Sequence, residues 1–395
     1  MTLFERIFKK QPRAAATSAA RFVKEPTAAF TRFTGDAYSS DIYRGAIDAI
    51  ARNVSKLKGS HIILDGDTRL PGDARLNRLL QNRPNPYMSS ASWLYKMATH
   101  YWGYNNAFSL IARDGRGSVA GIYPINSTNV EFLTDAGGNL FCRFTFRTGQ
   151  QAIFAYDDLI HLRRNFNNNE LLGDDNSALF PALEAAQTIN EGITQAIKSA
   201  ANIRGIVRYS EMMPDEMLKE VKEKFVNNYL TIDNNGGVIP LDSKFDFTPV
   251  DSKPVLLSAA QTEAIKKSIY DYLGINESIV NSSYSEDCYS AFYESVIEPF
   301  AVELGQEMTA KIFTPREIAY GNSIMFESGR LQFTSNTTKV AIIEKLIPMG
   351  LLTLNEAREI LNLPGLEDGN QRIVSLNYVN TEIADEYQLE GAGNG

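Results

Sequence analysis

The chain has 395 residues and a formal net charge of −8 at pH 7, with 44% hydrophobic and 22% charged residues. This composition is ordinary for a folded protein, and the length allows two or three folding units. Two distant cysteines, Cys142 and Cys288, argue against a disulfide framework or a structural zinc site. No apolar run reaches the ~20 residues that span a bilayer. The negative charge also argues against a general sequence-independent DNA-binding protein, which would cluster Lys and Arg.

Charge is distributed unevenly along the chain. Residues 1–24 contain six Lys or Arg and a single acidic residue, Glu5, whereas residues 257–313 contain nine acidic residues and three lysines. Residues 367–395 contain six acidic residues and Arg372. We therefore expect surfaces that face different partners, and a basic N-terminal arm over residues 1–39 that docks on one of them. Its apolar residues share one helical face, so organellar targeting and membrane contact remain alternatives.

The N-terminal part predicts helices followed by strands. Apolar residues three and four apart predict a helix over 39–58, and Ser89 or Ser90 can cap a second helix that carries Trp93 and Met97. From residue 107 the period changes to two. The turns "DGRG" and "DAGGN" predict two hairpins, and "QAIFAY" and "LIHLRR" add two strands. We interpret this β-rich block as a meander.

The middle of the chain predicts two long helices around a small mixed insert. The first helix spans 177–203, with Pro181 in its first turn. The insert contains the strand "GIVRYS", a helix that starts at Pro214, and the strands "VIPL" and "FDFTPV". The second helix runs from about Val255 to Leu273, with Glu263, Lys266 and Lys267 turned away from an apolar stripe. That stripe comprises Leu257, Ala260, Ala264, Ile265, Ile269, Tyr272 and Leu273.

The C-terminal part begins with a polar loop opened by Gly274, "GINESIVNSSYSED". A helix over about 287–313 follows, in which Pro299 predicts a kink, and "TPREIAYGNSIMFESGRLQFT" predicts strands. In "LIPMGLLTLNEAREILNLPGLEDGN", Thr353 and Glu356 have the spacing of a capping box. A helix that reads DNA bases needs several cations or amides. Because this short helix has only Arg358, we favour a packing role.

Four segments, in this order, resemble the portal, or head-to-tail connector, proteins of tailed bacteriophages. They are "GYNNAFSLIARDGRGSVAGIYPI", "DDLIHLRRNFNNNELLGDDNSAL", "GINESIVN…SAFYESVIEPFAVELGQEM" and "IPMGLLTLNEAREILNLPGLEDGN". The resemblance covers about residues 40 to 375. One departure is Asn105-Asn106-Ala107, where the family has a simpler Gly-Asn-Ala. The resemblance implies an α+β fold: an elongated portal-type subunit with a β-rich wing, a two-helix stem, a small α/β clip and a helical crown.

The resemblance also implies a division of the chain into these parts. The basic arm is 1–39, the wing 40–176 and 288–336, the stem helices 177–203 and 255–274, the clip 204–254, the tunnel loop 275–287, and the crown with the acidic tail 337–395.

The resemblance further implies a structural function in the virion, at the portal vertex of the capsid. Identical subunits, usually twelve, form a ring through which double-stranded DNA is packaged and ejected without being held tightly. The ring docks the terminase, the major capsid protein and a head–tail adaptor protein. We expect the channel to be lined by Lys266 and Lys267 of the stem and by Asn276, Ser278, Asn281, Ser282, Ser283, Tyr284 and Ser285 of the tunnel loop. We expect the clip to dock partners through Asp215, Glu216, Lys219 and Lys222.

Enzymatic functions find little support in the sequence. His161 follows two aspartates, so a hydrolase remains an alternative, as does a membrane-associated adaptor that uses the basic arm. No nucleophile elbow or P-loop spacing is present, and a histidine at a strand end is typical of a structural residue. The pairs Glu294/Glu298 and Glu303/Glu307 have the spacing of metal ligands, yet helix faces explain them better. We expect no enzyme activity, cofactor or metal.

Overall fold

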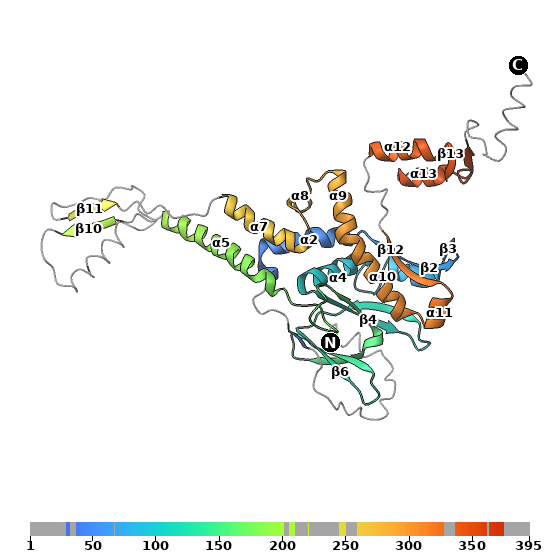
Figure 1. The fold of residues 1–395 in the computed structure, drawn as a ribbon, viewed down its shortest axis with the longest axis horizontal. Helices are drawn as coiled ribbons and strands as arrows, with labels where there is room; N and C mark the ends of the chain where they lie inside the picture. The colour runs from blue at the N-terminus through green and yellow to red at the C-terminus, as the bar shows by residue number, and fades with distance from the viewer. Residues whose placement is uncertain are drawn as a thin grey trace, which may run out of the picture. The chain divides into compact units, whose positions relative to one another are not determined.

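The structure is a computed structural model that describes residues 29–31, 37–66, 68–200, 205–209, 220, 245–249, 259–327, 336–361 and 363–374. The chain combines helices with antiparallel sheets, and the strands β4 to β9 follow one another without an intervening α-helix, which confirms the α+β class (Figure 1). The chain divides into two compact units. Described residues within 29–31, 47–174 and 278–374 belong to the first unit, and those within 37–46 and 175–277 belong to the second.

Two antiparallel sheets carry the core of the first unit. One has the strand order β5-β4-β9 and the other β1-β6-β7-β8. Their strands are β1 (Ala29–Thr31), β4 (Asn106–Arg113), β5 (Val119–Pro124), β6 (Asn129–Thr134), β7 (Leu140–Thr145), β8 (Gln151–Ala155) and β9 (Leu159–Arg163). Both predicted hairpins, β4–β5 and β6–β7, are confirmed. The prediction of a single meander is wrong. Strand β9 follows β8 in the sequence but pairs with β4, with His161 opposite Phe108.

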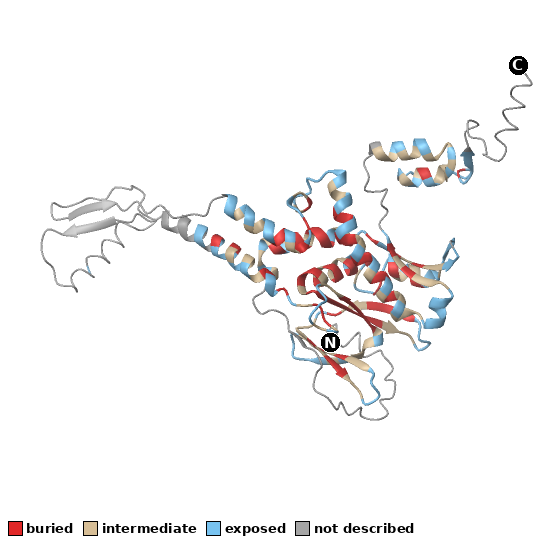
Figure 2. Ribbon diagram, viewed as in Figure 1, coloured by how far each residue is buried: buried red, intermediate tan, exposed pale blue. Residues whose placement is uncertain are grey.

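Strand β4 is buried on both faces. Its side chains at Phe108 and Leu110 pack with Val130, Phe132 and other residues of β6, β7 and β9. On the opposite face, Ser109 accepts a hydrogen bond of 2.9 Å from the indole N–H of Trp93. Trp93 lies on α4 (Ser90–Tyr104), the helix predicted to start at Ser89 or Ser90. The strand therefore lies between a helix and the second sheet, and it is among the most buried parts of the chain (Figure 2).

The turn between α4 and β4 explains the departure from the family pattern. Asn105 follows the last helical residue with φ 53°, the left-handed region that asparagine tolerates better than most residues. Its side-chain amide donates to the Asp174 carbonyl at 2.7 Å. Asn106 accepts from the N–H of Gly173 at 3.0 Å. The two asparagines thus attach the start of β4 to the segment that follows β9.

A third sheet has the order β12-β2-β3. It consists of β2 (Lys58–Asp65), β3 (Thr68–Pro71) and β12 (Asn322–Glu327), and α3 (Ala74–Gln81) follows β3. The sequence did not predict β2, β3 or α3. The prediction of strands over 314–334 is confirmed for β12 but wrong for Pro315–Ala319, which forms α11, and residues 328–334 lie outside the described residues. Thr314 caps that helix and exchanges hydrogen bonds with Glu317, a capping box that the spacing already contained.

The long helix before α11 is continuous but irregular. It consists of α9 (Glu286–Phe292), a π-helical turn (Tyr293–Ile297) and α10 (Glu298–Ile312). Pro299 is the second residue of α10 and lies inside this continuous helix, where its missing N–H removes one helical hydrogen bond. The irregularity predicted at Pro299 is therefore a π-helical turn directly before the proline.

The second unit is built on two helices that pack against each other, α5 (Phe180–Ala200) and α7 (Ala259–Leu273). Both agree with the predicted helices. Before α5 lies the short helix η3 (Ser177–Leu179), and before α2 (Asp41–Val54) lies η1 (Ala37–Ser39). The amide of Asn176 donates to the Tyr43 hydroxyl at 3.2 Å and accepts from the Tyr272 hydroxyl at 2.7 Å. This one side chain therefore ties the starts of α2 and α5 to the end of α7.

Of the predicted insert between these helices, two strands are described. They are β10 (Gly205–Tyr209) and β11 (Phe245–Pro249), which pair with each other and confirm two of the predicted strands. Of the helix predicted from Pro214, only Glu220 is described, and it is helical; the strand "VIPL" lies outside the described residues.

The C-terminal segment contains α12 (Asn336–Leu346), β13 (Met349–Thr353), α13 (Leu354–Ile360) and β14 (Arg372–Val374). Gly350 has φ 68°, a left-handed conformation that glycine adopts without steric cost. The side chains of Thr353 and Glu356 cap each other's backbone N–H groups, which confirms the predicted capping box.

Replacing Gly305 of α10 by alanine is expected to destabilise the first unit. An added Cβ would lie 2.7 Å from the Ile324 carbonyl oxygen on β12. Overpacking of this kind costs ~1–3 kcal/mol, against ~1 kcal/mol gained from helix propensity. The control is Gly192→Ala in α5, where no atom lies within 4 Å of the new Cβ and stability should rise slightly. Thermal unfolding compares both; a Gly305→Ala protein as stable as the wild type would contradict the close contact.

Candidate functional site

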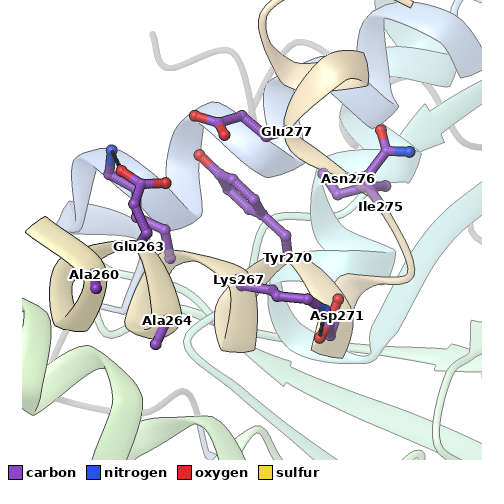
Figure 3. A pocket seen from close by; sticks show the side chains of 10 residues that line it. Ala260, Glu263, Ala264, Lys267, Tyr270, Asp271, Ile275, Asn276 and Glu277 are labelled. Carbon is purple, nitrogen blue, oxygen red and sulfur yellow. Dashed lines mark hydrogen bonds and ion pairs between the residues drawn. The ribbon is translucent and has the colours of Figure 1, made fainter.

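The described residues predicted to line the channel gather on α7 and on the segment that follows it. In the second unit, one face of α7 and the turn after it enclose a hollow of about 390 Å³ (Figure 3). Lys266, Lys267 and Asn276 line it together with Glu263, Ala260, Ala264, Tyr270, Asp271, Ile275 and Glu277. The structure thus brings both predicted stem lysines and one predicted tunnel-loop residue together.

Each of the two lysines has a carboxylate partner on its own helix. The Lys266 ammonium lies 3.0 Å from Glu263, and the Lys267 ammonium lies 2.6 Å from Asp271. The hydrogen bond to Glu263 raises the pKa of Lys266, so the lysine stays protonated. With Glu277 added, three carboxylates and two ammonium groups line the hollow. This face of α7 therefore carries no net positive charge.

The predicted apolar stripe of α7 is only partly correct. Ile269 and Leu273 are buried, as expected, but Ala260 and Ala264 are exposed and line the hollow. Tyr270, which was not in the stripe, is buried instead. Its burial, together with the nearby Glu277, raises the pKa of its phenol, so Tyr270 remains a neutral group at the floor of this acidic hollow.

The segment after α7 is more structured than the predicted polar loop. Gly274 has φ 75°, which confirms a turn at the glycine. Residues Glu277–Val280 then form the short helix α8, and Glu286 already belongs to α9. Ile279 is buried, because it points inward from α8. The prediction of a polar loop over 275–287 is therefore wrong for Glu277–Val280 and for Glu286 and Asp287, which are helical.

The remaining tunnel-loop residues have local roles in the first unit. Asn281, Ser282 and Ser283 are exposed, whereas Ser285 caps α9 by accepting from the Cys288 N–H at 3.3 Å. Tyr284 stacks on Tyr289 with ring centroids 5.2 Å apart. Ser278 lies 3.3 Å from the Cys288 sulfur. The predicted clip residues Asp215, Glu216, Lys219 and Lys222 lie outside the described residues.

His161 is a buried structural residue. Its Nδ1 lies 3.2 Å from the Tyr156 hydroxyl and its Nε2 lies 3.2 Å from the Asn106 side-chain oxygen, so both ring nitrogens have partners. The ring also stacks on Phe108 at 4.0 Å. Burial holds the pKa of His161 well below its usual value and raises the pKa of Tyr156 to about 12. A neutral histidine beside a firmly protonated phenol does not provide an activated nucleophile.

Glu303 and Glu307 of α10 bind the backbone of β9. Glu303 accepts from the Arg163 N–H at 2.8 Å and from the Tyr101 hydroxyl at 2.9 Å. Glu307 accepts from the His161 N–H at 3.3 Å. Within the described part of the chain, no group of three or more His, Cys, Asp or Glu residues is placed to hold a metal ion. The described helices also include none that is long and apolar enough to cross a bilayer.

Comparison with protein families gives a clear result. Residues 41–362 match the family described as "Phage portal protein". The chain belongs to this family. The match begins at the first residue of α2 and extends beyond α13, so it covers most of both compact units, including the hollow on α7 and the carboxylates of α10.

Individual portal proteins are distant in sequence. The "Probable portal protein" of Lactococcus phage p2 is 23% identical over 268 residues, which cover 63% of this chain and 68% of that protein. The portal protein of Enterobacteria phage HK97 is 21% identical over 326 residues, which cover 77% of this chain and 73% of that protein. A solved structure of the neck of a native gene transfer agent particle, computed with C12 symmetry, contains a chain of similar fold. The TM-score is 0.57 at 14% sequence identity, and the aligned part covers 87% of this chain and 96% of the neck chain. The portal fold is therefore shared at low identity.

The hydrogen bonds from α10 to β9 were missed by sequence reasoning. Glu303 and Glu307 are four residues apart on a helix, and the bonded N–H groups are two residues apart on a strand. These spacings are both close to ~6–7 Å, so the pattern fits one helix lying along one strand edge. The i, i+4 pair was visible in the sequence, but the partner strand is about 140 residues away. The sequence therefore showed the spacing of the two glutamates but gave no indication that β9 is their partner.

Two substitutions of Glu303 distinguish its role as a hydrogen-bond acceptor from the effect of its negative charge. Burial raises the pKa of Glu303, so its ionised form is disfavoured in the folded chain and its contribution to stability declines as pH rises through that pKa. Glu303→Gln keeps an acceptor for Arg163 and can donate to the Tyr101 oxygen, so we expect wild-type stability or better at pH 8. Glu303→Ala leaves two donors unsatisfied and should cost ~1–3 kcal/mol.

Urea unfolding at pH 5 and pH 8 measures both variants. The free energy of unfolding of the wild type minus that of Glu303→Gln should be larger at pH 5 than at pH 8. Equal losses for Gln and Ala at pH 8 would show that the carboxylate charge itself is needed.

Proposed function

We propose that this chain assembles into a closed ring at the portal vertex of a phage or phage-like particle, and that the ring is the passage for double-stranded DNA. Membership of the portal family carries the proposal. The fold shared with a chain of a particle neck computed with C12 symmetry supports a ring of twelve copies. In this proposal α5 and α7 are the stem helices, and β10 and β11 belong to the clip. Residues 40–176 and 288–336 form the wing, and residues 337–395 form the crown with the acidic tail.

The hollow on α7 has the chemistry that a passage requires. DNA that must move cannot be held by many lysine–phosphate contacts, because each neutralised phosphate adds affinity. Lys266 and Lys267 are both occupied by carboxylates of the same helix. The two lysines can therefore bind a passing phosphate only weakly, and Asn276, which lines the same hollow, offers a neutral hydrogen-bonding group. The surface is thus able to contact DNA and release it.

The proposed partners of the ring are the terminase, the major capsid protein and a head–tail adaptor protein. In this proposal the clip residues Asp215, Glu216, Lys219 and Lys222 dock the motor or the adaptor, and the wing docks the capsid. The chain acts as a structural component, and the partner motor supplies the energy for DNA movement. His161 does not support the alternative of a hydrolase, because both of its ring nitrogens are occupied.

Negative-stain electron microscopy of the purified full-length chain tests the ring directly. We expect ring-shaped particles with an axial channel and rotational symmetry close to twelvefold. Multi-angle light scattering should give a mass near twelve times the 44.0 kDa of the chain. A compact monomer over a wide range of protein concentrations would contradict the proposal.

Removing the carboxylate partners should convert the stem face into a DNA-binding face. In the double variant Glu263→Gln/Asp271→Asn, both lysines lose their ion pairs. We expect the assembled chain to bind duplex DNA more tightly, with a steeper dependence of log K on log salt, because more phosphate counterions are released. The charge-matched control is Asp65→Asn/Glu170→Gln, at two exposed carboxylates of the first unit. Equal salt slopes for the two variants would place Lys266 and Lys267 away from the DNA.

A further inference from the structure

One long stretch of the first unit contains no acidic residue. Residues 74–113 include no Asp or Glu, although 47 of the 395 residues of the chain are acidic. The wider segment 68–124, from β3 to β5, has seven Lys or Arg and two Asp, so its net charge is +5 in a chain of net charge −8. The elements of this segment therefore carry a locally positive surface.

Helix α3 directs its arginines away from the core. Leu76 and Leu80 are buried on the inward face. Arg75 and Arg78 are exposed and lie three residues apart, so their side chains are neighbours on the helix surface. Arg83, in the segment that follows the helix, is exposed as well. Three arginines thus follow one another along one part of the surface.

The turn between β4 and β5 adds a fourth arginine beside the start of α3. The Arg75 guanidinium lies 3.2 Å from the Asp114 carboxylate in this turn. The other oxygen of Asp114 accepts hydrogen bonds of 3.0 Å from the N–H groups of Arg116 and Ser118. The backbone of Arg116 is therefore held next to Arg75 by one shared carboxylate, and Arg116 is exposed.

Most of these arginines keep their charge available. Within the described part of the chain, no carboxylate forms an ion pair with Arg78, Arg83 or Arg116. The two aspartates of the segment have local roles, because Asp73 caps α3 by accepting from the Leu76 N–H, and Asp114 fixes the β4–β5 turn. This differs from α7, where both lysines have carboxylate partners.

The chemistry of this surface fits the phosphate backbone of double-stranded DNA. Phosphate oxygens are bound mainly by Arg and Lys, with amide and hydroxyl side chains beside them. Gln81 and Asn82 are exposed next to the arginines, and Tyr87 is 46% exposed. A protein partner usually needs large apolar or aromatic residues at the centre of the contact, whereas the leucines of α3 are buried or half-buried.

The net charge of −8 does not prevent such a contact. At physiological salt, exposed charges more than ~8 Å apart are largely screened from each other. A phosphate that lies beside α3 therefore interacts mainly with the arginines of this surface.

We infer that the surface of α3, of the segment that follows it and of the β4–β5 turn binds the phosphate backbone of double-stranded DNA without reading its sequence. This is a DNA contact additional to the proposed passage, because it lies in the first unit and the hollow on α7 lies in the second. It does not require the ring, since a single chain carries all the residues of the surface.

The test is a fluorescence anisotropy titration of a labelled short duplex with the full-length chain, between ~50 and ~200 mM salt. In the double variant Arg78→Gln/Arg116→Gln, we expect the slope of log K against log salt to become shallower by about 2, because each phosphate contact contributes ~0.9. The affinity at the lowest salt should fall by about tenfold. Both positions are exposed, so the circular dichroism spectrum and thermal unfolding should be unchanged.

The matched control is Arg147→Gln/Arg372→Gln, which removes the same charge at two other exposed arginines and should keep the wild-type slope. Equal slopes for the two double variants would overturn the inference. Polyglutamate that binds more tightly than the duplex, with the same loss in Arg78→Gln/Arg116→Gln, would also overturn it, because the partner would then be an acidic protein.

Electron microscopy of the same samples separates this inference from the proposed function. Rings in every sample together with equal slopes would show that only the DNA contact at α3 is wrong. DNA binding that depends on Arg78 and Arg116 in a chain that forms no rings would support this inference and contradict the proposed ring.

Discussion

The contact between α10 and strand β9 is the constraint on which much of the first unit depends. Strand β9 is the edge of its sheet, and its outward N–H groups would otherwise be open to another strand. Carboxylates from Glu303 and Glu307 occupy these groups. The helix is fixed further where Arg113 of β4 donates to the Lys311 carbonyl at 2.7 Å. A helix that is bound in this way by its polar side chains cannot turn its charges to solvent.

This arrangement connects the interior of the unit with its surface. The carboxylates are retained inside despite a raised pKa, so their ionised forms are costly to bury. Their hydrogen bonds to the strand backbone and to Tyr101 offset part of that cost. The outer row of α10 is left with uncharged residues only. One helix orientation therefore protects the edge of the sheet and also leaves the exposed positions of α10 uncharged.

The second unit uses charge in a different way. On α7, lysines and carboxylates alternate at i, i+3 and i, i+4 and form ion pairs on a solvent-exposed face. Such exposed pairs add little to stability. Their main effect is to reduce the positive electrostatic potential of the surface, because each lysine has a carboxylate within 3.0 Å. The two units thus treat charge differently: α10 directs its carboxylates toward a strand backbone, whereas α7 pairs its charges on an exposed face.

The sequence by itself determined the elements whose signals are local. These signals come from residues a few positions apart, and they predicted the α4 cap at Ser89, the hairpins β4–β5 and β6–β7, the helices α5 and α7, and the capping box of Thr353 and Glu356. Sequence motifs in the order of the family were sufficient to recognise the portal family. Only the tertiary structure decided which strand β9 joins, that β2 pairs with β12, that Ala264 is exposed and Tyr270 buried, and that Glu303 binds a distant strand. These outcomes depend on partners up to about 270 residues away, as in the pairing of Lys58 with Glu327. A periodic sequence pattern shows that one face of a helix or strand is apolar or charged. Which element packs against that face is determined only when the chain folds.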